Sequence, residues 1–187
     1  MAKTDKKLIT QVAADLADRD GLDKVTLKDL AQTLNIRSPS LYNHISGLDE
    51  VRASIMLYGW AQLGTIIARS TVGKSKDDAI RAMCKSYRDY TMAHPGVFEA
   101  MMWYNQSSSQ EATQATSELS QLVALVLAGY NLDKKKNIHA SRMFRSFLQG
   151  FCSIVNNNGF ADHTPIQESF DFAVEILIKG LDSLESL

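Results

Sequence analysis

The stretch Thr26–Ile45, TLKDLAQTLNIRSPSLYNHI, decides the fold of this 187-residue chain because it predicts two short helices joined by a tight turn. Thr26 offers a side-chain acceptor at a helix start, and apolar residues follow it at the i, i+3, i+4 and i+7 spacing of an amphipathic helix. Asn35 stands where that helix must end, since asparagine tolerates the left-handed backbone conformation. The pair Ser38 and Pro39 then predicts a second helix, with Ser38 as its N-cap and Pro39 as its first helical residue.

The second helix has an inward and an outward side. Leu41 and Ile45 are four residues apart, so both point toward the core. The remaining positions carry hydroxyl, phenol, amide and imidazole groups and point outward: Ser40, Tyr42, Asn43 and His44. Such groups suit base edges and phosphates, although a solvated polar face on an ordinary helical hairpin is the alternative. The spacing of small and apolar residues through the turn favours DNA binding.

The segment from about Lys6 to Ile45 resembles the DNA-binding domain of the TetR (tetracycline repressor) family of bacterial transcription regulators. The residues that carry the resemblance lie on three expected helices and their connections: Ala13, Ala14, Leu16, Asp20, Gly21, Thr26, Leu27, Leu30, Ala31, Leu34, Ile36, Ser38, Leu41, Tyr42, His44 and Ile45. This resemblance and the polar outward face together imply that eight residues contact DNA: Thr26, Lys28, Arg37, Ser38, Ser40, Tyr42, Asn43 and His44. One position departs from the family pattern, since Leu48 stands where the family usually has a phosphate-contacting lysine.

Composition limits the class of protein. A hydrophobic fraction of 45% and a charged fraction of 22% are ordinary for a globular chain and exclude the disordered and fibrous classes. Only three prolines, long stretches of helical periodicity and no strand-like alternation predict an all-α fold. The N-terminal MAKTDKK is polar and precedes no long apolar run, so we expect no secretory signal, no membrane span and a cytoplasmic protein.

Net charge does not by itself indicate a nucleic-acid partner. The chain has a formal net charge of −1 at pH 7. Residues 1–46 contain seven lysines and arginines against six aspartates, which gives this segment a net charge of +1. The expectation that double-stranded DNA is a partner therefore depends on the motif and on where cations such as Lys28 and Arg37 are placed.

Two domains are expected, a helix-turn-helix head over residues 1–46 and a helical bundle over residues 47–187, with about nine helices in total. Asn131 predicts the start of a long helix in the bundle, and the capping box Thr164–Gln167 predicts the start of the last one. A second resemblance, to the TetR C-terminal domain type named for a Trp-His-Gly motif, rests on four short segments: 94–98, 147–151, 159–160 and 169–170. Gln149 stands where that motif has histidine. The resemblance implies that the bundle binds a small molecule and forms a dimer.

Soft and aromatic side chains in the bundle are candidates for an effector cavity, because methionine and amphipathic aromatic residues make adaptable pockets. They are Met83, Tyr87, Met101, Trp103, Tyr104, Phe147 and Phe151. Ordinary core packing is the alternative for each of them, since a large apolar residue at helical spacing is normally buried in a core.

The last helix has a wider apolar surface than one core face needs, and burial against a second copy of the chain accounts for the excess. The residues expected at this dimer interface share one stripe: Phe170, Ala173, Val174, Leu177, Leu181 and Leu184. A dimer also places two recognition helices in successive major grooves of a pseudo-palindromic site.

Catalytic and metal-binding motifs are not apparent. The sequence has no nucleophile elbow, phosphate loop or dinucleotide fingerprint, and neither its cysteines, Cys84 and Cys152, nor its histidines have metal-ligand spacing. We therefore expect no enzyme activity, cofactor or metal. The sequence predicts a homodimeric transcription regulator, a repressor that a small-molecule effector releases from its operator. An effector-independent architectural DNA-binding dimer is the alternative, and an all-helical enzyme would need a polar cluster that the sequence does not offer.

Overall fold

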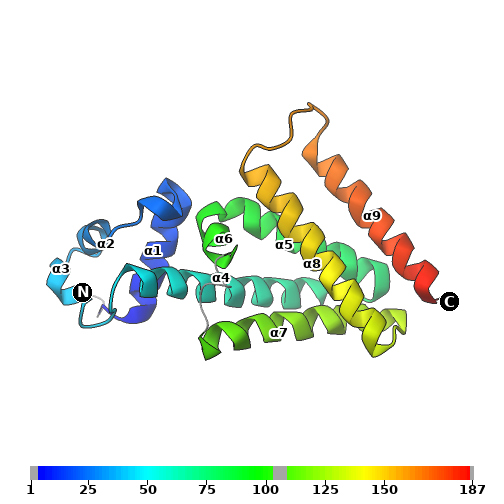
Figure 1. Ribbon diagram of the computed structural model, residues 1–187, viewed down its shortest axis with the longest axis horizontal. Coiled ribbons are helices and arrows are strands. Elements are labelled where there is room, and N and C mark those ends of the chain that lie inside the picture. The colour runs from blue at the N-terminus through cyan, green and yellow to red at the C-terminus, as the bar shows by residue number, and fades with distance from the viewer. Residues whose placement is uncertain (1–3, 103–108, 186–187) are drawn as a thin grey trace. The chain divides into compact units, whose positions relative to one another are not determined.

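The computed structural model describes residues 4–102 and 109–185 of the chain. Nine α-helices and no strands occur in these ranges, which confirms the predicted all-α class. The helices, labelled in Figure 1, are α1 (Lys6–Asp20), α2 (Leu27–Thr33), α3 (Ser38–Leu41), α4 (Leu48–Thr71), α5 (Lys76–Ala93), α6 (Pro95–Met102), α7 (Gln110–Leu127), α8 (Lys134–Asn156) and α9 (Ile166–Glu185). No helix in the described ranges is both long and apolar enough to cross a membrane.

The chain divides into two compact units. The first contains residues 1–62 and 93–116, and the second contains residues 63–92 and 117–187. The helix α4 contributes to both units, and the chain returns to the first unit through α6. The boundary expected after residue 46 therefore does not coincide with the division into compact units, and it stays a prediction about where the reading head ends.

The first unit is built around α1, which packs on α2 and α6. Asp5 caps the start of α1 by accepting a hydrogen bond from the backbone N–H of Leu8 (2.8 Å), and Gly21 ends the helix with φ 102°. The inward side of α1 buries Ile9 and Ala13, which are 1% and 0% exposed. These apolar residues lie on one side of α1 and contribute to the core of the first unit.

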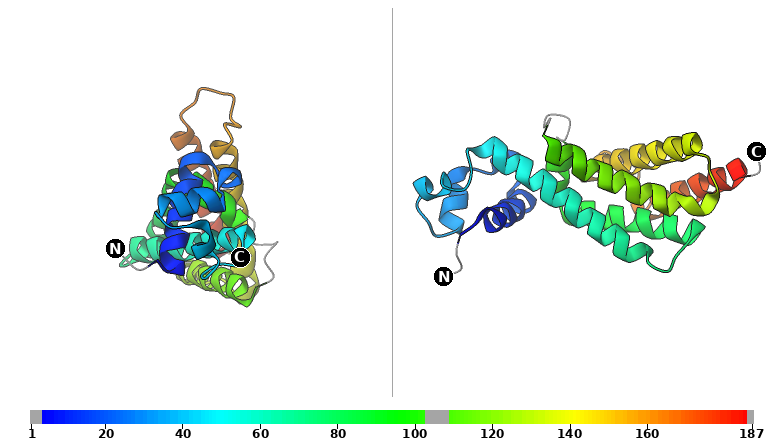
Figure 2. Two further views of the ribbon diagram at one scale, coloured as in Figure 1. Left: turned by 90° about the vertical axis from the view of Figure 1, so that its left-hand side faces the viewer. Right: turned by 90° about the horizontal axis from the view of Figure 1, so that it is seen from below.

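The second unit places α8 and α9 side by side, as Figures 1 and 2 both show. Arg81 of α5 donates to Glu175 of α9 through Nε (2.6 Å) and Nη2 (2.9 Å), and this interaction lowers the pKa of the Glu175 carboxyl. The fully buried large side chains of the second unit come from several helices and include Leu63, Ile67, Ile80, Tyr130, Phe144 and Phe170.

Two helix starts in the second unit differ from the prediction. Asp133 caps α8, because its carboxylate accepts from two backbone N–H groups of the first turn, each at 2.8 Å. Asn131 instead ends the short 3-10 turn Ala128–Tyr130 with φ 49°. At α9 the Thr164 hydroxyl donates to Asp162 and does not cap the helix, which begins at Ile166. Several residues able to cap lie close together in both connections, and the geometry of the turn selects among them.

Candidate nucleic-acid interface and small-molecule site

The helix α2 begins and ends as its sequence predicts. Thr26 Oγ1 accepts a hydrogen bond from the backbone N–H of Asp29 (3.2 Å) and donates to Asp29 Oδ2 (2.6 Å). The helix is followed by Asn35, whose φ of 53° lies in the left-handed region. The Thr26 cap and the left-handed backbone at Asn35 together determine the direction in which the chain enters α3.

The helix α3 starts one residue earlier than predicted. Arg37, not Ser38, takes the N-cap place, and the Arg37 carbonyl accepts from the backbone N–H of Ser40 (2.8 Å). Pro39 thus occupies the second helical position. The difference is physically small, since the first N–H groups of a helix lack intrahelical partners, so Pro39 loses nothing at either position.

The two sides of the recognition segment are as expected. Leu41 and Ile45 are 0% and 4% exposed, whereas Tyr42 between them is 60% exposed. Asn43 and His44 are also on the surface. The eight residues predicted to contact DNA are all exposed except Ser40, which is half-buried: Thr26, Lys28, Arg37, Ser38, Ser40, Tyr42, Asn43 and His44. Their contact with DNA stays a prediction.

Side-chain interactions connect the start of α4 to the start of α1, and the sequence did not predict them. Glu50 accepts from the backbone N–H (2.7 Å) and the hydroxyl (2.8 Å) of Ser46, and Lys6 Nζ lies 2.5 Å from its other oxygen. The hydrogen bond from Lys6, with those from Ser46, lowers the pKa of the Glu50 carboxyl to about 2. Leu48, which replaces the family's lysine, is half-buried in the same turn.

Replacing Glu50 with glutamine is expected to lower the free energy of unfolding by about 1 kcal/mol at pH 7, because a charge-assisted cap is lost. The pKa of Glu50 is lower in the folded protein than its ordinary value of 4.5, so its stabilisation is fully present above pH 4.5 and is lost as the pH falls toward 2. Urea denaturation of both proteins between pH 7 and pH 3.5 should show a difference that shrinks at acidic pH. A difference independent of pH would contradict this role of the carboxylate.

The end of α1 holds the start of α6 through contacts between residues far apart in sequence. Asp18 accepts from the backbone N–H of Val97 (2.9 Å), and its other oxygen lies 2.7 Å from His94 Nδ1. Gly96 rests directly on α1, since a Cβ there would lie 2.1 Å from the Ala17 carbonyl oxygen. An aspartate of α1 thus caps α6. In the sequence, the segment from His94 to Gly96 contributed only to the second resemblance.

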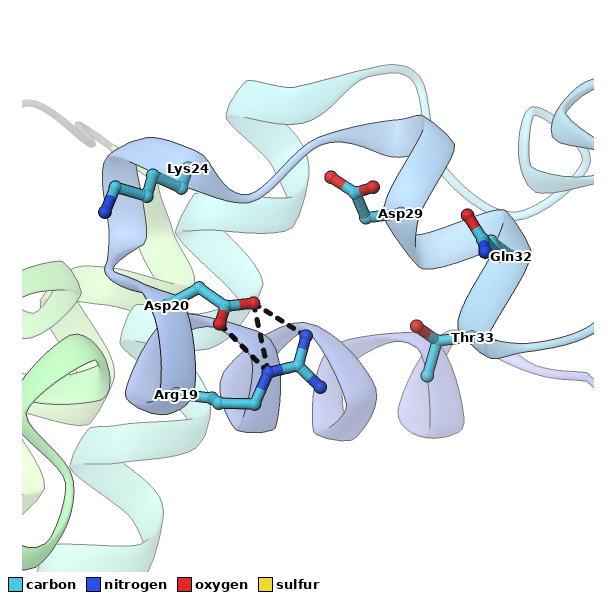
Figure 3. A pocket seen from close by; sticks show the side chains of 6 residues that line it. All are labelled: Arg19, Asp20, Lys24, Asp29, Gln32 and Thr33. Carbon is cyan, nitrogen blue, oxygen red and sulfur yellow. Dashed lines mark hydrogen bonds and ion pairs between the residues drawn. The ribbon is translucent and has the colours of Figure 1, made fainter.

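A polar hollow of about 730 Å³ lies between the end of α1 and α2 (Figure 3). It is lined by Arg19, Asp20, Lys24, Asp29, Gln32 and Thr33. Arg19 donates to Asp20 through both Nε and Nη2, the shorter contact being 2.6 Å, and this hydrogen bonding lowers the pKa of Asp20. Two cations face two carboxylates, so the hollow has no net charge that would favour an anion or a cation.

The predicted effector residues are distributed over both units, and their contact with an effector stays a prediction. Met83 and Tyr87 are buried on α5 in the second unit, while Met101 is buried on α6 in the first. Phe147 and Phe151 of α8 pack on Phe170 of α9, with ring centroids 5.5 and 5.2 Å from its ring. The other two predicted residues, Trp103 and Tyr104, lie outside the described part of the chain.

Arg145 and Gln149, which the sequence did not indicate as site residues, lie near Tyr87. Burial raises the pKa of the Tyr87 phenol, and Cys152 adds to this effect, whereas Arg145 and hydrogen bonding with Gln149 lower it. Gln149 therefore lies beside the phenol, and the lowering of the pKa means that its amide donates toward the phenol oxygen. One signal for Gln149 is present in the sequence, because this residue stands where the Trp-His-Gly motif has histidine.

Most of the α9 stripe predicted to form a dimer interface is buried inside the second unit. Phe170, Val174 and Leu181 are 1%, 4% and 0% exposed, so they have no area to offer to a second copy. Ala173, Leu177 and Leu184 are half-buried. The exposed apolar residues of α9 are Phe172 and Ile176, at 69% and 53%. The more regular apolar stripe of α9 is buried in the core of the second unit, whereas the opposite side, with fewer apolar residues, is exposed.

Among the described residues no three histidine, cysteine or acidic side chains come together in a way that could hold a metal ion. The two cysteines, Cys84 and Cys152, are buried thiols on α5 and α8. Burial raises the pKa of Cys84 to about 12, with a smaller contribution from Cys152, so this thiol is neutral at physiological pH.

Comparison with known proteins identifies relatives along nearly the whole chain. The family model described as "Tetracyclin repressor-like, C-terminal domain" matches residues 80–177. The chain is 33% identical over 181 residues to YobS of Bacillus subtilis (strain 168), an HTH-type transcriptional regulator, covering 94% of this chain and 92% of the relative.

Solved structures of low sequence identity share the fold. SCO7222, a TetR from Streptomyces coelicolor, superposes with a TM-score of 0.77 at 17% identity, covering 98% of this chain and 100% of that one. A TetR variant from Acinetobacter baumannii AYE in complex with minocycline has a TM-score of 0.75 at 19% identity, with 99% and 100% covered. At these identities the likeness is evidence for the fold alone, a helix-turn-helix head followed by a helical bundle.

Proposed function

Because the chain belongs to the tetracycline repressor-like (TetR) family of transcriptional regulators, which are not enzymes, we propose that it is a homodimeric repressor that a small-molecule effector releases from its operator. In this proposal, α3 and the turn after it, residues 38–44, read the operator in the major groove. The bundle formed by the second unit binds the effector and the second copy of the chain.

The orientation of residues 41–45 is the observation that carries the proposal. Leu41 and Ile45 anchor the segment in the core, so that Tyr42, Asn43 and His44 stand together on the surface. An asparagine amide matches the donor and acceptor pattern of adenine in the major groove, and phenol and imidazole groups donate hydrogen bonds to phosphates or base edges. Exposed cations nearby in the sequence supply phosphate contacts that fix the register.

The outer side of α8 and α9 supports the dimer. Phe172 and Ile176 of α9 are exposed, and Met143 of α8 is 37% exposed. A soluble chain seldom leaves large apolar side chains of adjacent helices in water without a partner. A second copy related by a two-fold axis covers them, and the same axis matches the symmetry of a pseudo-palindromic operator.

Release by an effector needs only a modest difference in affinity. A coupling free energy of about 1–3 kcal/mol between the two sites changes DNA affinity roughly 5- to 150-fold. The fold is shared with a TetR variant whose structure contains minocycline, a small molecule bound by that protein.

Replacing Tyr42 with alanine is expected to weaken operator binding at least about 10-fold, since one lost base or phosphate contact costs roughly 1–3 kcal/mol. A gel-shift titration at fixed salt, on the DNA upstream of the protein's own gene, measures the effect. The matched control is Leu125→Ala, which shortens a side chain that is 72% exposed on α7 and should leave binding unchanged. Equal affinity of the Tyr42 variant and the wild type would remove α3 from the DNA interface.

The same titration separates the repressor from the architectural alternative. Extracts of small molecules from the host are added to the complex of the wild-type protein with DNA. Release of the DNA by an extract supports effector control. Specific binding that no extract releases supports the effector-independent dimer.

A further inference from the structure

The end of the recognition segment, residues 38–45, and the turn after it have no lysine or arginine of their own. The sequence contains neither residue type between Arg37 and Arg52. The same stretch contains two acidic residues, Asp49 and Glu50, in the first turn of α4. Proteins that bind DNA neutralise its phosphates with lysine and arginine side chains. A DNA backbone that passes this turn therefore needs a cation from another part of the chain.

Lys6 of α1 is a cation that the fold brings to this turn (Figure 1 labels α1 and α4). Its Nζ lies 2.5 Å from Glu50 Oε1. Glu50 Oε2 accepts hydrogen bonds from the backbone N–H (2.7 Å) and the hydroxyl (2.8 Å) of Ser46, the residue that directly follows Ile45. One carboxylate group thus separates the Lys6 ammonium from the end of the recognition segment.

Lys6 is the more exposed member of its ion pair. Its side chain is 56% exposed, whereas that of Glu50 is 30% exposed. Both oxygens of Glu50 have partners, but an ammonium has three N–H donors and this contact uses one of them. The other two donors are able to bind a phosphate oxygen.

The neighbouring cations have different surroundings. The Arg52 side chain is only 24% exposed and lies 4.0 Å from Asp49. Lys7 follows Lys6 directly, but it points about 100° further around α1. Lys6 differs from both because Glu50 already holds its exposed ammonium in place, so less side-chain freedom is lost when a phosphate binds.

We propose that Lys6 binds a phosphate of the DNA backbone at the end of the recognition segment, and that Glu50 is the residue that positions it. The inference rests on the operator binding proposed above and adds a residue of α1 to that interface. A phosphate is the same in every DNA sequence, so this contact strengthens binding and fixes the register without selecting the operator.

Salt titrations of the Lys6→Gln variant test the proposal on two duplexes of equal length, the DNA upstream of the protein's own gene and an unrelated sequence. The dissociation constants of the full-length protein are measured between about 50 and 200 mM salt. Each phosphate contact contributes about 0.9 to the slope of log K against log salt concentration, so losing one contact per subunit of a dimer should reduce the slope by about 1.8. We expect binding to both duplexes to weaken roughly 10-fold at about 100 mM salt, with the ratio of the two affinities unchanged.

Two matched variants separate a local contact from a change of net charge. Lys7→Gln removes the same charge one residue away and should reduce the slope by less than half as much. Lys6→Arg keeps a cation that reaches both Glu50 and a phosphate, so its slope and affinities should stay close to those of the wild type. All three variants should keep the urea midpoint of the wild type within a small margin, because an exposed ion pair contributes little to stability.

Three results would overturn the proposal. Equal slopes for Lys6→Gln and the wild type would leave Lys6 and Glu50 as a pair that only joins two helices. A loss confined to the upstream duplex would indicate base reading instead of a phosphate contact. Equal losses for Lys6→Gln and Lys7→Gln would mean that net charge alone explains the effect.

Failure of this inference can be told from failure of the proposed function. Operator binding that host extracts release, with a slope that does not depend on Lys6, would overturn only the phosphate contact. Binding that depends on Lys6 but that no extract releases would leave the phosphate contact in place and count against the effector-controlled repressor. A wild-type protein that binds neither duplex would overturn both.

Discussion

Replacing Gly96 with alanine should lower the free energy of unfolding by about 3 kcal/mol or more, because the added methyl group has no space. A Cβ at this position would lie 2.1 Å from the Ala17 carbonyl oxygen and 2.7 Å from the Asp18 nitrogen. Both are backbone atoms, which no change of rotamer can move. Relief requires α6 to separate from α1, and this also removes the Asp18 cap from the N–H of Val97.

Urea denaturation followed by circular dichroism measures this effect as a lower midpoint with an unchanged slope. The control is Gly64→Ala in α4, where a Cβ meets no described atom within 4 Å. Alanine is the better helix former by about 1 kcal/mol, so the control should be neutral or stabilising. Equal midpoints for Gly96→Ala and the wild type would mean that α6 can move off α1 without cost.

The features that the sequence predicted correctly depend on residues near one another in the chain. Thr26 caps the helix that directly follows it, and Asn35 ends that helix through its own backbone conformation. Leu41 and Ile45 are one turn apart, so helical periodicity alone places both in the core. The outward positions of Tyr42 and its neighbours follow from the same geometry.

Contacts between distant residues were not predictable from such patterns. Asp18 and Val97 are 79 residues apart, and nothing local marks an aspartate near the end of one helix as the cap of another. The pairing of Lys6 with Glu50 joins two helix starts across 44 residues and was missed for the same reason. Gln149 was noticed only as a departure from a family motif, since its place beside the Tyr87 phenol is a property of the folded chain.

For the dimer interface, periodicity selected a side of α9 that is largely buried within the single chain, and the interface itself stays a prediction. Periodicity identifies the most regular apolar stripe, and this stripe contains Phe170 and Val174, which the second unit uses for its own core. Phe172 and Ile176 were assigned to no stripe, although they are the large apolar residues of α9 that stay exposed. A sequence shows how much apolar surface a helix has, whereas the packed structure shows which part is left for a partner.

Replacing Phe170 with alanine is expected to lower the free energy of unfolding by about 3–5 kcal/mol, the usual cost of removing a buried aromatic side chain. Phe170 is 1% exposed, its ring lies 5.5 Å from the ring of Phe147 and 5.2 Å from that of Phe151, and the Arg88 guanidinium lies 4.9 Å above it. The variant leaves a cavity between α8 and α9 and removes this cation–π contact. Urea denaturation at a fixed protein concentration measures the loss.

Phe172→Ala is the matched control, because it removes the same ring two residues further along α9 from a side chain that is 69% exposed. It should keep the helical content and leave the second unit's core intact, but it should weaken self-association in sedimentation equilibrium. The denaturation midpoint of this variant then falls mainly at low protein concentration, since a dimer gains stability by mass action. A dissociation constant equal to that of the wild type would place the dimer contact elsewhere and leave the exposed side of α9 without a second copy to cover it. The two phenylalanines thus separate folding of the chain from its assembly, because one ring lies in the core and the other on the surface.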